Sequence, residues 1–176
     1  MTVREILAEA MSLSRIPISD KDFLDNFNRA VFDIENKHDI AKRVVKRAVV
    51  CDDIREEYSL TDGCMGIQRV LTGDGYYTTR YIVRENNIMF DCKGVYFLYE
   101  KLPHERITSM SDKPTISPAY HYSIAKYIAS KILERTDLDS SKSFMEDYIL
   151  ETEQMSASLR KSSNTGRRII KAPIHR

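Results

Sequence analysis

Apolar residues recur at helical spacing in the first part of the chain. Thr2 and Glu5 have the spacing of a capping box, and the apolar stripe that follows predicts a helix over about 3–14. Ser19 can cap a second helix, and a broad stripe after it predicts a helix over about 19–36. Because few residues separate the two, we expect a compact helical hairpin whose stripes face the core.

The most regular stripe lies in the segment SPAYHYSIAKYIASKILE, which runs from Ser117 to Glu134. Ser117 suits the capping position and Pro118 the first helical position, since proline has no N–H to leave unpaired there. We therefore expect a helix over about 118–136. A further stripe that ends near Leu159 predicts a last helix over about 141–160.

Between the second and third helices, short β-prone runs predict a sheet over about 44–101. A first strand that ends near Cys51 is favoured, although 40–45 could also extend as helix. The clearest part is a three-stranded meander, formed by 81–83, 88–90 and 95–99. In its first hairpin, Asn86 and Asn87 tolerate the left-handed backbone that a tight turn requires. Because these strands are apolar on both faces, we expect the helices to cover one face and a neighbouring subunit the other.

These elements together predict an α+β fold that is mainly α. Four helices form a bundle, and a small antiparallel β-sheet is inserted between the hairpin of the first two helices and the last two. We expect a single domain over 1–162, because the chain is of ordinary size for one core. A linker-like composition after Lys161 then leads into an extended C-terminal arm over 163–176.

The composition is that of a globular protein. Hydrophobic residues make up 42% of the chain and charged residues 30%, and no run approaches the roughly 20 apolar residues of a membrane span. We therefore expect no membrane partner, and the N-terminus lacks the apolar core of a signal peptide. Cys51, Cys64 and Cys92 form no CxxC pair, which favours synthesis in a reducing compartment.

The net charge of +1 hides an asymmetry along the chain. Of the 27 bases, six follow Glu153, and no acid does. Residues 1–153 therefore contain 21 bases and 26 acids. An acidic body with a basic tail suggests that the tail has a function of its own, and a solvated terminus without one is the alternative.

No motif for catalysis or for a bound cofactor stands out in the sequence. The four histidines never reach a metal-ligand spacing. The acid pairs Asp52-Asp53 and Glu56-Glu57 lie in a polar stretch, where solvated charge is the commoner reason for such pairs. We predict no catalytic residue, no metal, no cofactor and no enzyme activity. A hydrolase would need a cluster of Cys, His and carboxylates assembled by folding, and that alternative stays open.

The basic tail is the strongest functional candidate. Its cations are interleaved with isoleucines rather than with aromatic residues that would stack on bases. Such a segment suits strand addition, or insertion into a protein groove that is both apolar and acidic, with folding on contact. The predicted partner-binding residues of the arm are Arg167, Arg168, Ile169, Ile170, Lys171, Pro173, Ile174 and Arg176.

Several segments, in their order along the chain, resemble a known family. The segment FLDNFNRAVFDIENK is followed by EEYSLTDGCMGIQRVL, by YIVRENNIMFDCKGVYFLYEKLP and by TSMSDKPTISPAYHYSIAKYIASKILER, before the last helix. This arrangement is similar to that of the head-to-tail adaptor (connector) proteins of tailed bacteriophages, which sit beneath the portal. The likeness covers most of 19–155, with 40–53 the weakest part. It consists of patterns rather than of a catalytic signature.

The resemblance implies a structural virion protein at the head–tail junction, synthesised in the cytoplasm of a bacterial host. It implies a ring, commonly of twelve copies, that binds the portal protein and the tail or further connector proteins. DNA would pass through the lumen during packaging, retention and ejection without sequence-specific binding, and an acidic body would let it slide. The arm, 166–176 in this chain, would embrace the portal.

A second class of function fits the charge of the tail. A DNA-binding accessory protein could grip phosphates with these cations without reading sequence. Because phosphate contacts weaken steeply as salt rises, this alternative predicts salt-sensitive DNA binding.

Overall fold

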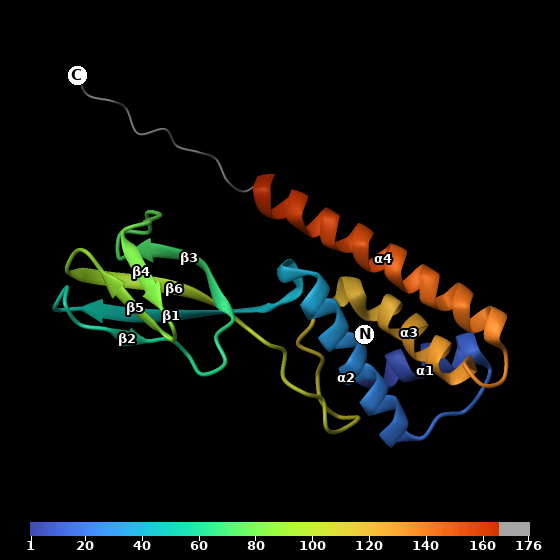
Figure 1. Cartoon of the computed structure of the whole chain (residues 1–176). Coiled ribbons are helices and arrows are strands. Elements are labelled where there is room, and N and C mark those ends of the chain that lie inside the picture. Colours follow the sequence, from blue (N-terminus) through green and yellow to red (C-terminus); the bar gives the residue numbers. More distant parts are fainter. Residues whose placement is uncertain (166–176) are drawn as a thin grey trace. The chain divides into compact units, whose positions relative to one another are not determined.

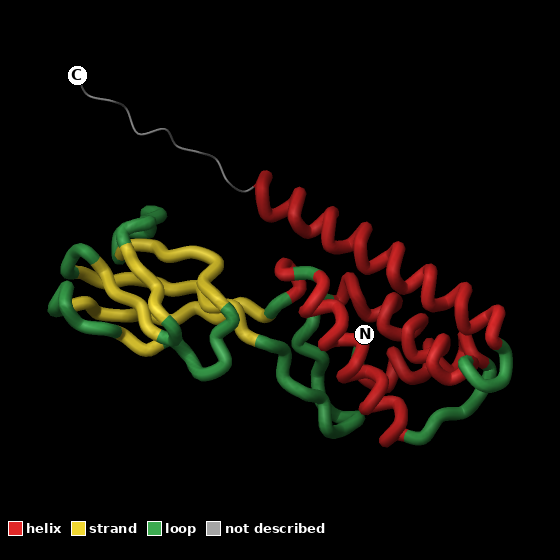
Figure 2. The backbone as a smooth tube through the Cα atoms, viewed as in Figure 1, coloured by secondary structure: helices red, strands yellow, loops and turns green. Residues whose placement is uncertain are grey.

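The computed structural model describes residues 1–165, which form two compact units (Figure 1 and Figure 2). The helical unit comprises Met1–Ala41 and the described residues from Arg106 onward. The β unit comprises Lys42–Glu105 and therefore interrupts the chain of the helical unit once.

Four α-helices and two short 3-10 helices make up the regular structure of the helical unit within residues 1–165. In chain order they are α1 (Val3–Ser14), α2 (Asp20–Lys37), η1 (Asp39–Ala41), η2 (Pro118–Tyr120), α3 (His121–Leu133) and α4 (Leu138–Thr165). The four predicted helices are confirmed. The third begins with a 3-10 turn at Pro118, and the fourth is longer than expected at both ends.

The ends of the first two helices are set by short polar side chains. Glu5 N–H donates to Thr2 Oγ1 at 3.2 Å, and Thr2 N–H donates to the Glu5 carboxylate at 2.7 Å, which completes the capping box. Asp22 N–H donates to Ser19 Oγ at 3.2 Å and begins α2 in the same way. α1 ends at Arg15, whose φ of 56° turns the chain out of the helix.

The helical unit has one hydrophobic core, to which all four α-helices and the connector before η2 contribute. Its largest members include Ile6, Phe23, Phe27, Ile34, Ile107, Ile116, Tyr120, Ile124, Ile128 and Tyr148. Full burial of one such side chain contributes about 1.5–3 kcal/mol. The apolar stripes therefore stabilise these helices more than intrinsic helix propensity does.

The β unit contains two antiparallel sheets of three strands. The strands are β1 (Arg43–Cys51), β2 (Tyr58–Ser59), β3 (Gly66–Thr72), β4 (Tyr81–Arg84), β5 (Asn87–Phe90) and β6 (Gly94–Leu102). One sheet has the order β1-β6-β3 and the other the order β2-β5-β4. Their facing side chains form a second core, in which the rings of Phe90 and Tyr96 stack with centroids 3.9 Å apart.

The predicted fold class, a four-helix bundle with one small inserted sheet, is wrong. The strands make two sheets in a compact unit of their own. The predicted meander is wrong as well. The hairpin of β4 and β5 is present, but β6 leaves that sheet and becomes the middle strand of the other. Gly94, with φ 151°, lies at this change of direction and has a backbone that side chains disfavour.

Two local strand predictions have separate outcomes. The strand that ends at Cys51 is confirmed as β1. In the β4–β5 turn, Glu85 rather than an asparagine has the left-handed backbone, with φ 52°. The expectation that the helices cover one face of these strands is wrong for β6, because its inward face, with Tyr96 and Leu98, packs in the core between the two sheets.

Candidate functional site

The outward face of the β1-β6-β3 sheet is the most conspicuous exposed surface of the β unit. The register places four outward residues of β1 opposite four of β6 and, beyond them, two of β3. We call this surface the outer sheet face; it consists of Val44, Lys46, Ala48, Val50, Arg69, Leu71, Val95, Phe97, Tyr99 and Lys101. None of these ten side chains belongs to the core of the β unit.

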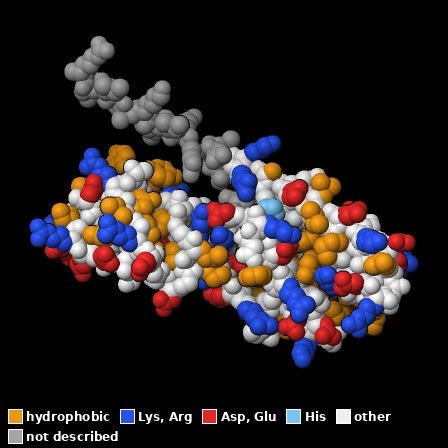
Figure 3. Space-filling view, viewed as in Figure 1, with side chains coloured by type: hydrophobic (Ala, Val, Ile, Leu, Met, Phe, Trp, Pro, Cys, Tyr) orange, Lys and Arg blue, Asp and Glu red, His pale blue; other side chains and the backbone are white. Residues whose placement is uncertain are grey.

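The outer sheet face combines apolar side chains with cations. Val50 is 56% exposed and its cross-strand partner Val95 is 42% exposed. Lys46 Nζ lies 4.1 Å from the centroid of the Phe97 ring, and the Arg69 guanidinium lies 3.9 Å from that of Tyr99. Over the visible side of the β unit as a whole, Figure 3 shows orange hydrophobic, blue basic and red acidic side chains intermixed. No acidic residue is among the ten that define the face.

The cations on this face also cover its aromatic rings. A base that stacks on a protein surface needs a free ring face. Because Lys46 and Arg69 occupy ring faces of Phe97 and Tyr99, the outer sheet face is better suited to a protein surface than to single-stranded nucleic acid.

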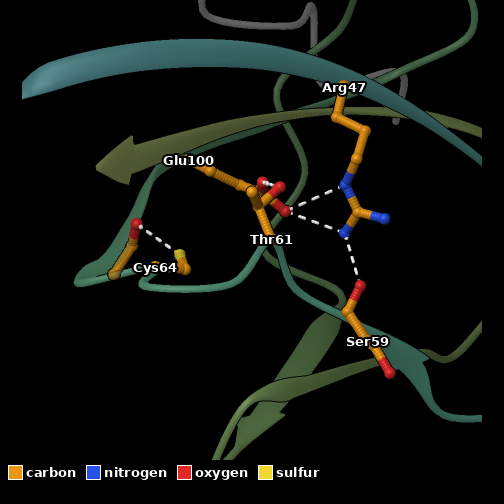
Figure 4. Close-up of polar contacts among 6 residues, drawn as sticks. Arg47, Ser59, Thr61, Cys64 and Glu100 are labelled. Carbon is orange, nitrogen blue, oxygen red and sulfur yellow. Dashed lines mark hydrogen bonds and ion pairs between the residues drawn. The ribbon is translucent and has the colours of Figure 1, made fainter. Parts of the chain in front are cut away.

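An ion pair between a half-buried arginine and a buried carboxylate lies on the opposite, inner face of β6 (Figure 4). The Glu100 side chain is fully buried, and its Oε1 accepts from Arg47 Nε at 3.0 Å and from Arg47 Nη2 at 2.8 Å. Thr61 Oγ1 donates to the other carboxylate oxygen. Arg47 Nη2 also donates to the carbonyl oxygen of Ser59 in β2, at 2.7 Å. The cluster therefore ties β1 and β6 to the chain of the second sheet.

A second polar cluster joins α3 to α4. Lys126 Nζ donates to Glu151 at 2.6 Å and to Asp147 at 2.9 Å, and Ser123 Oγ donates to Glu151 at 3.1 Å. Burial opposes the charge on Lys126, but the bonds to the two carboxylates outweigh it and raise the pKa of the amine. A lysine held charged by two acids is a structural cation rather than a proton acceptor.

Two of the four histidines are buried in the helical unit. His121 Nε2 lies 3.2 Å from the carbonyl oxygen of Ile116, while its Nδ1 and the Nε2 of His38 have no hydrogen-bond partner among the described residues. Burial lowers the pKa of His121. Burial also lowers the pKa of His38, and the positive charge of the nearby Arg160 lowers it further. Both imidazoles are thus kept neutral near pH 7.

The other residues weighed as chemical candidates are spread over the β unit. Cys51 is buried, Cys64 is half-buried and Cys92 is exposed, and all three are free thiols. Cys64 Sγ donates to the carbonyl oxygen of Gly66 at 3.3 Å. Within residues 1–165, no group of three or more His, Cys, Asp or Glu side chains could hold a metal ion.

The predicted partner-binding residues of the C-terminal arm lie outside the described residues. These are Arg167, Arg168, Ile169, Ile170, Lys171, Pro173, Ile174 and Arg176. The structure therefore leaves their assignment a prediction. Across 1–165, none of the helices is long and apolar enough to cross a membrane.

The chain has no significant match among protein-family models or among curated proteins.

Sequence reasoning missed the Arg47–Glu100 pair and the outer sheet face. The pair joins residues 53 positions apart, so no local spacing announces it. One signal was present: Glu100 takes the position of a buried residue in the alternation of VYFLYEKL, after Tyr96 and Leu98. An acid at such a position needs a buried partner.

Proposed function

We propose that this protein is a head-to-tail adaptor, a structural virion protein that forms a ring between portal and tail. The observation that carries the proposal is the order of the segments that resemble this family, from the second helix to the last. The ring, of about twelve copies by this resemblance, lets DNA pass through its lumen, and its C-terminal arm binds the portal.

Two features of the described residues support a role in assembly. The outer sheet face leaves apolar side chains such as Val50 and Val95 exposed, and the cations of Lys46 and Arg69 lie on the same face. The Lys126 amine, whose pKa is raised, is bonded to Glu151 and Asp147 and so has a structural role between α3 and α4. Contiguous exposed apolar surface is typical of protein–protein contact sites.

Binding to the portal protein of the same phage tests the proposal. A chain that stops after Thr165 keeps all of α4 and loses the arm. We expect full-length protein to bind the portal and the shortened chain to bind it at least about tenfold more weakly. Equal binding by both chains would contradict the role of the arm, and no binding by either would contradict the adaptor function.

Two matched variants separate a protein groove from a phosphate backbone as the partner of the arm. In one, Ile169, Ile170 and Ile174 are replaced by serine, and the cations stay. In the other, Arg167, Arg168 and Lys171 are replaced by serine, and the isoleucines stay. An apolar groove on the portal requires the isoleucines, whereas DNA binding requires the cations alone and weakens steeply with salt.

A further inference from the structure

The outward side of α4 carries a second exposed apolar surface, and its charge is opposite to that of the outer sheet face. Glu146, Ile149, Leu150 and Glu153 follow one another at i, i+3, i+4 and i+7 and are all exposed. We call these four residues the α4 stripe. Ile149 is 43% and Leu150 54% exposed. Of the four acids between 143 and 159, Asp147 and Glu151 are bonded to Lys126, and Glu146 and Glu153 are the two that belong to the stripe.

The two surfaces also match in spacing. Lys46 and Arg69 both pair with Tyr99 of β6, one from each side, so two strand spacings of about 4.8 Å, or about 10 Å, separate them. Glu146 and Glu153 are seven residues apart on a helix, which is also about 10 Å. Ile149 and Leu150 lie between the two acids of the stripe, as Tyr99 lies between the two cations of the outer sheet face.

We propose that the outer sheet face of one copy binds the α4 stripe of a second copy. In this contact Glu146 and Glu153 meet Lys46 and Arg69, and Ile149 and Leu150 cover the apolar residues of β1 and β6. The outer sheet face cannot pair with itself in the same way, because its cations would face each other. The contact therefore joins unlike surfaces, and when such a contact repeats head to tail it builds a ring or a filament.

This inference rests on the proposed ring, since it names the surfaces through which copies of the ring meet. The test below measures association between copies and not portal binding. The proposed interface and the proposed adaptor function can therefore fail separately. If portal binding survives but the variants below leave association between copies unchanged, this interface is wrong and the adaptor function stands.

Exchange of charge between two variants provides the test. Lys46→Glu makes the sheet face repel the stripe, and Glu146→Lys makes the stripe repel the sheet face. Sedimentation velocity of the full chain at low salt, over a concentration series up to about 1 mM, measures association between copies. We expect wild-type protein to associate and each variant alone to associate at least about fivefold more weakly. A one-to-one mixture of the two should regain wild-type association, because each altered surface then meets its complement on the other variant.

Two further variants separate loss of the contact from loss of the fold. Val50→Glu places an acid at an exposed position near the end of β1, on the outer sheet face beside Val95, and should weaken association as well. Arg84→Glu makes the same change of charge as Lys46→Glu, but at an exposed position of β4 in the other sheet. It should leave association unchanged.

Each remaining result overturns the proposal. Wild-type protein that stays monomeric throughout the series excludes the contact. A mixture that associates no better than its components points to another occupant, such as α4 of the same chain. Binding of a dT30 oligonucleotide that Lys46→Glu abolishes, without association between copies, assigns the face to nucleic acid instead.

Discussion

Arg47 and Glu100 form a two-bond ion pair in which both guanidinium bonds, of 3.0 and 2.8 Å, end on the same buried carboxylate oxygen. Arg47 belongs to β1 and Glu100 to β6, and the pair reaches the second sheet through Ser59 and Thr61. A buried charge without its partner is costly. Removing Arg47 alone should therefore destabilise the fold more than replacing Arg47 and Glu100 together.

Arg47→Met should therefore destabilise the protein by about 2–4 kcal/mol, because Glu100 would stay buried without a cation. The double variant Arg47→Met/Glu100→Leu should regain much of this loss, since an apolar pair of similar volume needs no compensation. Urea unfolding followed by far-UV circular dichroism measures both. Arg84→Met, at an exposed position of β4, is the control and should shift stability by less than about 0.5 kcal/mol. An Arg47→Met protein as stable as this control would contradict the assigned role of the pair.

Lys126 and Lys131 allow a buried and a half-buried lysine of the same helix to be compared. Lys126→Met leaves Glu151 and Asp147 without their cation at the α3–α4 contact, and we expect a loss of about 1–3 kcal/mol. Lys131→Met removes the pair with Glu134, at 3.4 Å, and a longer contact with the Tyr127 ring, and should cost less than about 1 kcal/mol. Thermal unfolding of the two variants under one set of conditions provides the comparison. A larger loss for Lys131→Met would show that the cluster does not hold these helices together.

Protonation of His121 should destabilise the folded chain. Burial lowers the pKa of His121 below its ordinary 6.5, whereas the carbonyl oxygen of Ile116 and the nearby Glu5 oppose this shift. The unfolded chain thus binds the proton more readily than the folded chain does. Stability is complete above about pH 6.5 and falls as the pH is lowered from there toward the pKa of the folded state.

His121→Gln keeps a hydrogen-bond donor for Ile116 and removes the titration. The variant should lose less stability between pH 7.5 and 5.5 than the wild type, by about 1 kcal/mol. Urea midpoints at the two pH values give the difference. His38→Gln is a second test of the same kind, since the pKa of His38 is lowered as well. Identical pH dependence in His121→Gln and the wild type would argue against a neutral, buried imidazole.

Tyr148 and Tyr120 allow a charge-assisted hydrogen bond to be compared with a neutral one. Tyr148 Oη donates to Asp33 Oδ2 at 2.7 Å, and burial together with this bond raises the pKa of the phenol. The hydroxyl of Tyr120 pairs with Ser156 Oγ at 2.8 Å. We expect Tyr148→Phe to cost about 1.5–3 kcal/mol and Tyr120→Phe about 1 kcal/mol, because bonds to charged groups are stronger. Lys37 also pairs with the same Asp33 oxygen, at 2.8 Å. Equal losses in urea unfolding would mean that Lys37 alone is enough to compensate the charge of Asp33.

The helices could be predicted from the sequence because their signals are local. Thr2 with Glu5, Ser19 and the apolar stripes act within a few residues of the backbone that they shape. The β4–β5 hairpin is local in the same sense. The sheet order could not be predicted, because β6 pairs with β1 and β3, which lie far back in the sequence. Pairing over such separations depends on the whole core and not on the nearest turn.

The interaction surfaces were beyond prediction for a related reason. Val44, Lys46 and Val50 alternate with buried residues of β1, but the sequence does not say which set faces out. Only the register with β6 brings Lys46 and Arg69 to either side of Tyr99. The arm residues from Arg167 to Arg176 were identified by composition, and their role stays a prediction.

The proposed adaptor function is best tested by electron microscopy of the protein mixed with the portal protein that the proposal assigns to it as a partner. We expect a closed ring of like copies, stacked on the portal, with a central hole about as wide as duplex DNA. Copies that stay single in the presence of the portal, or a ring whose centre is filled, would contradict it.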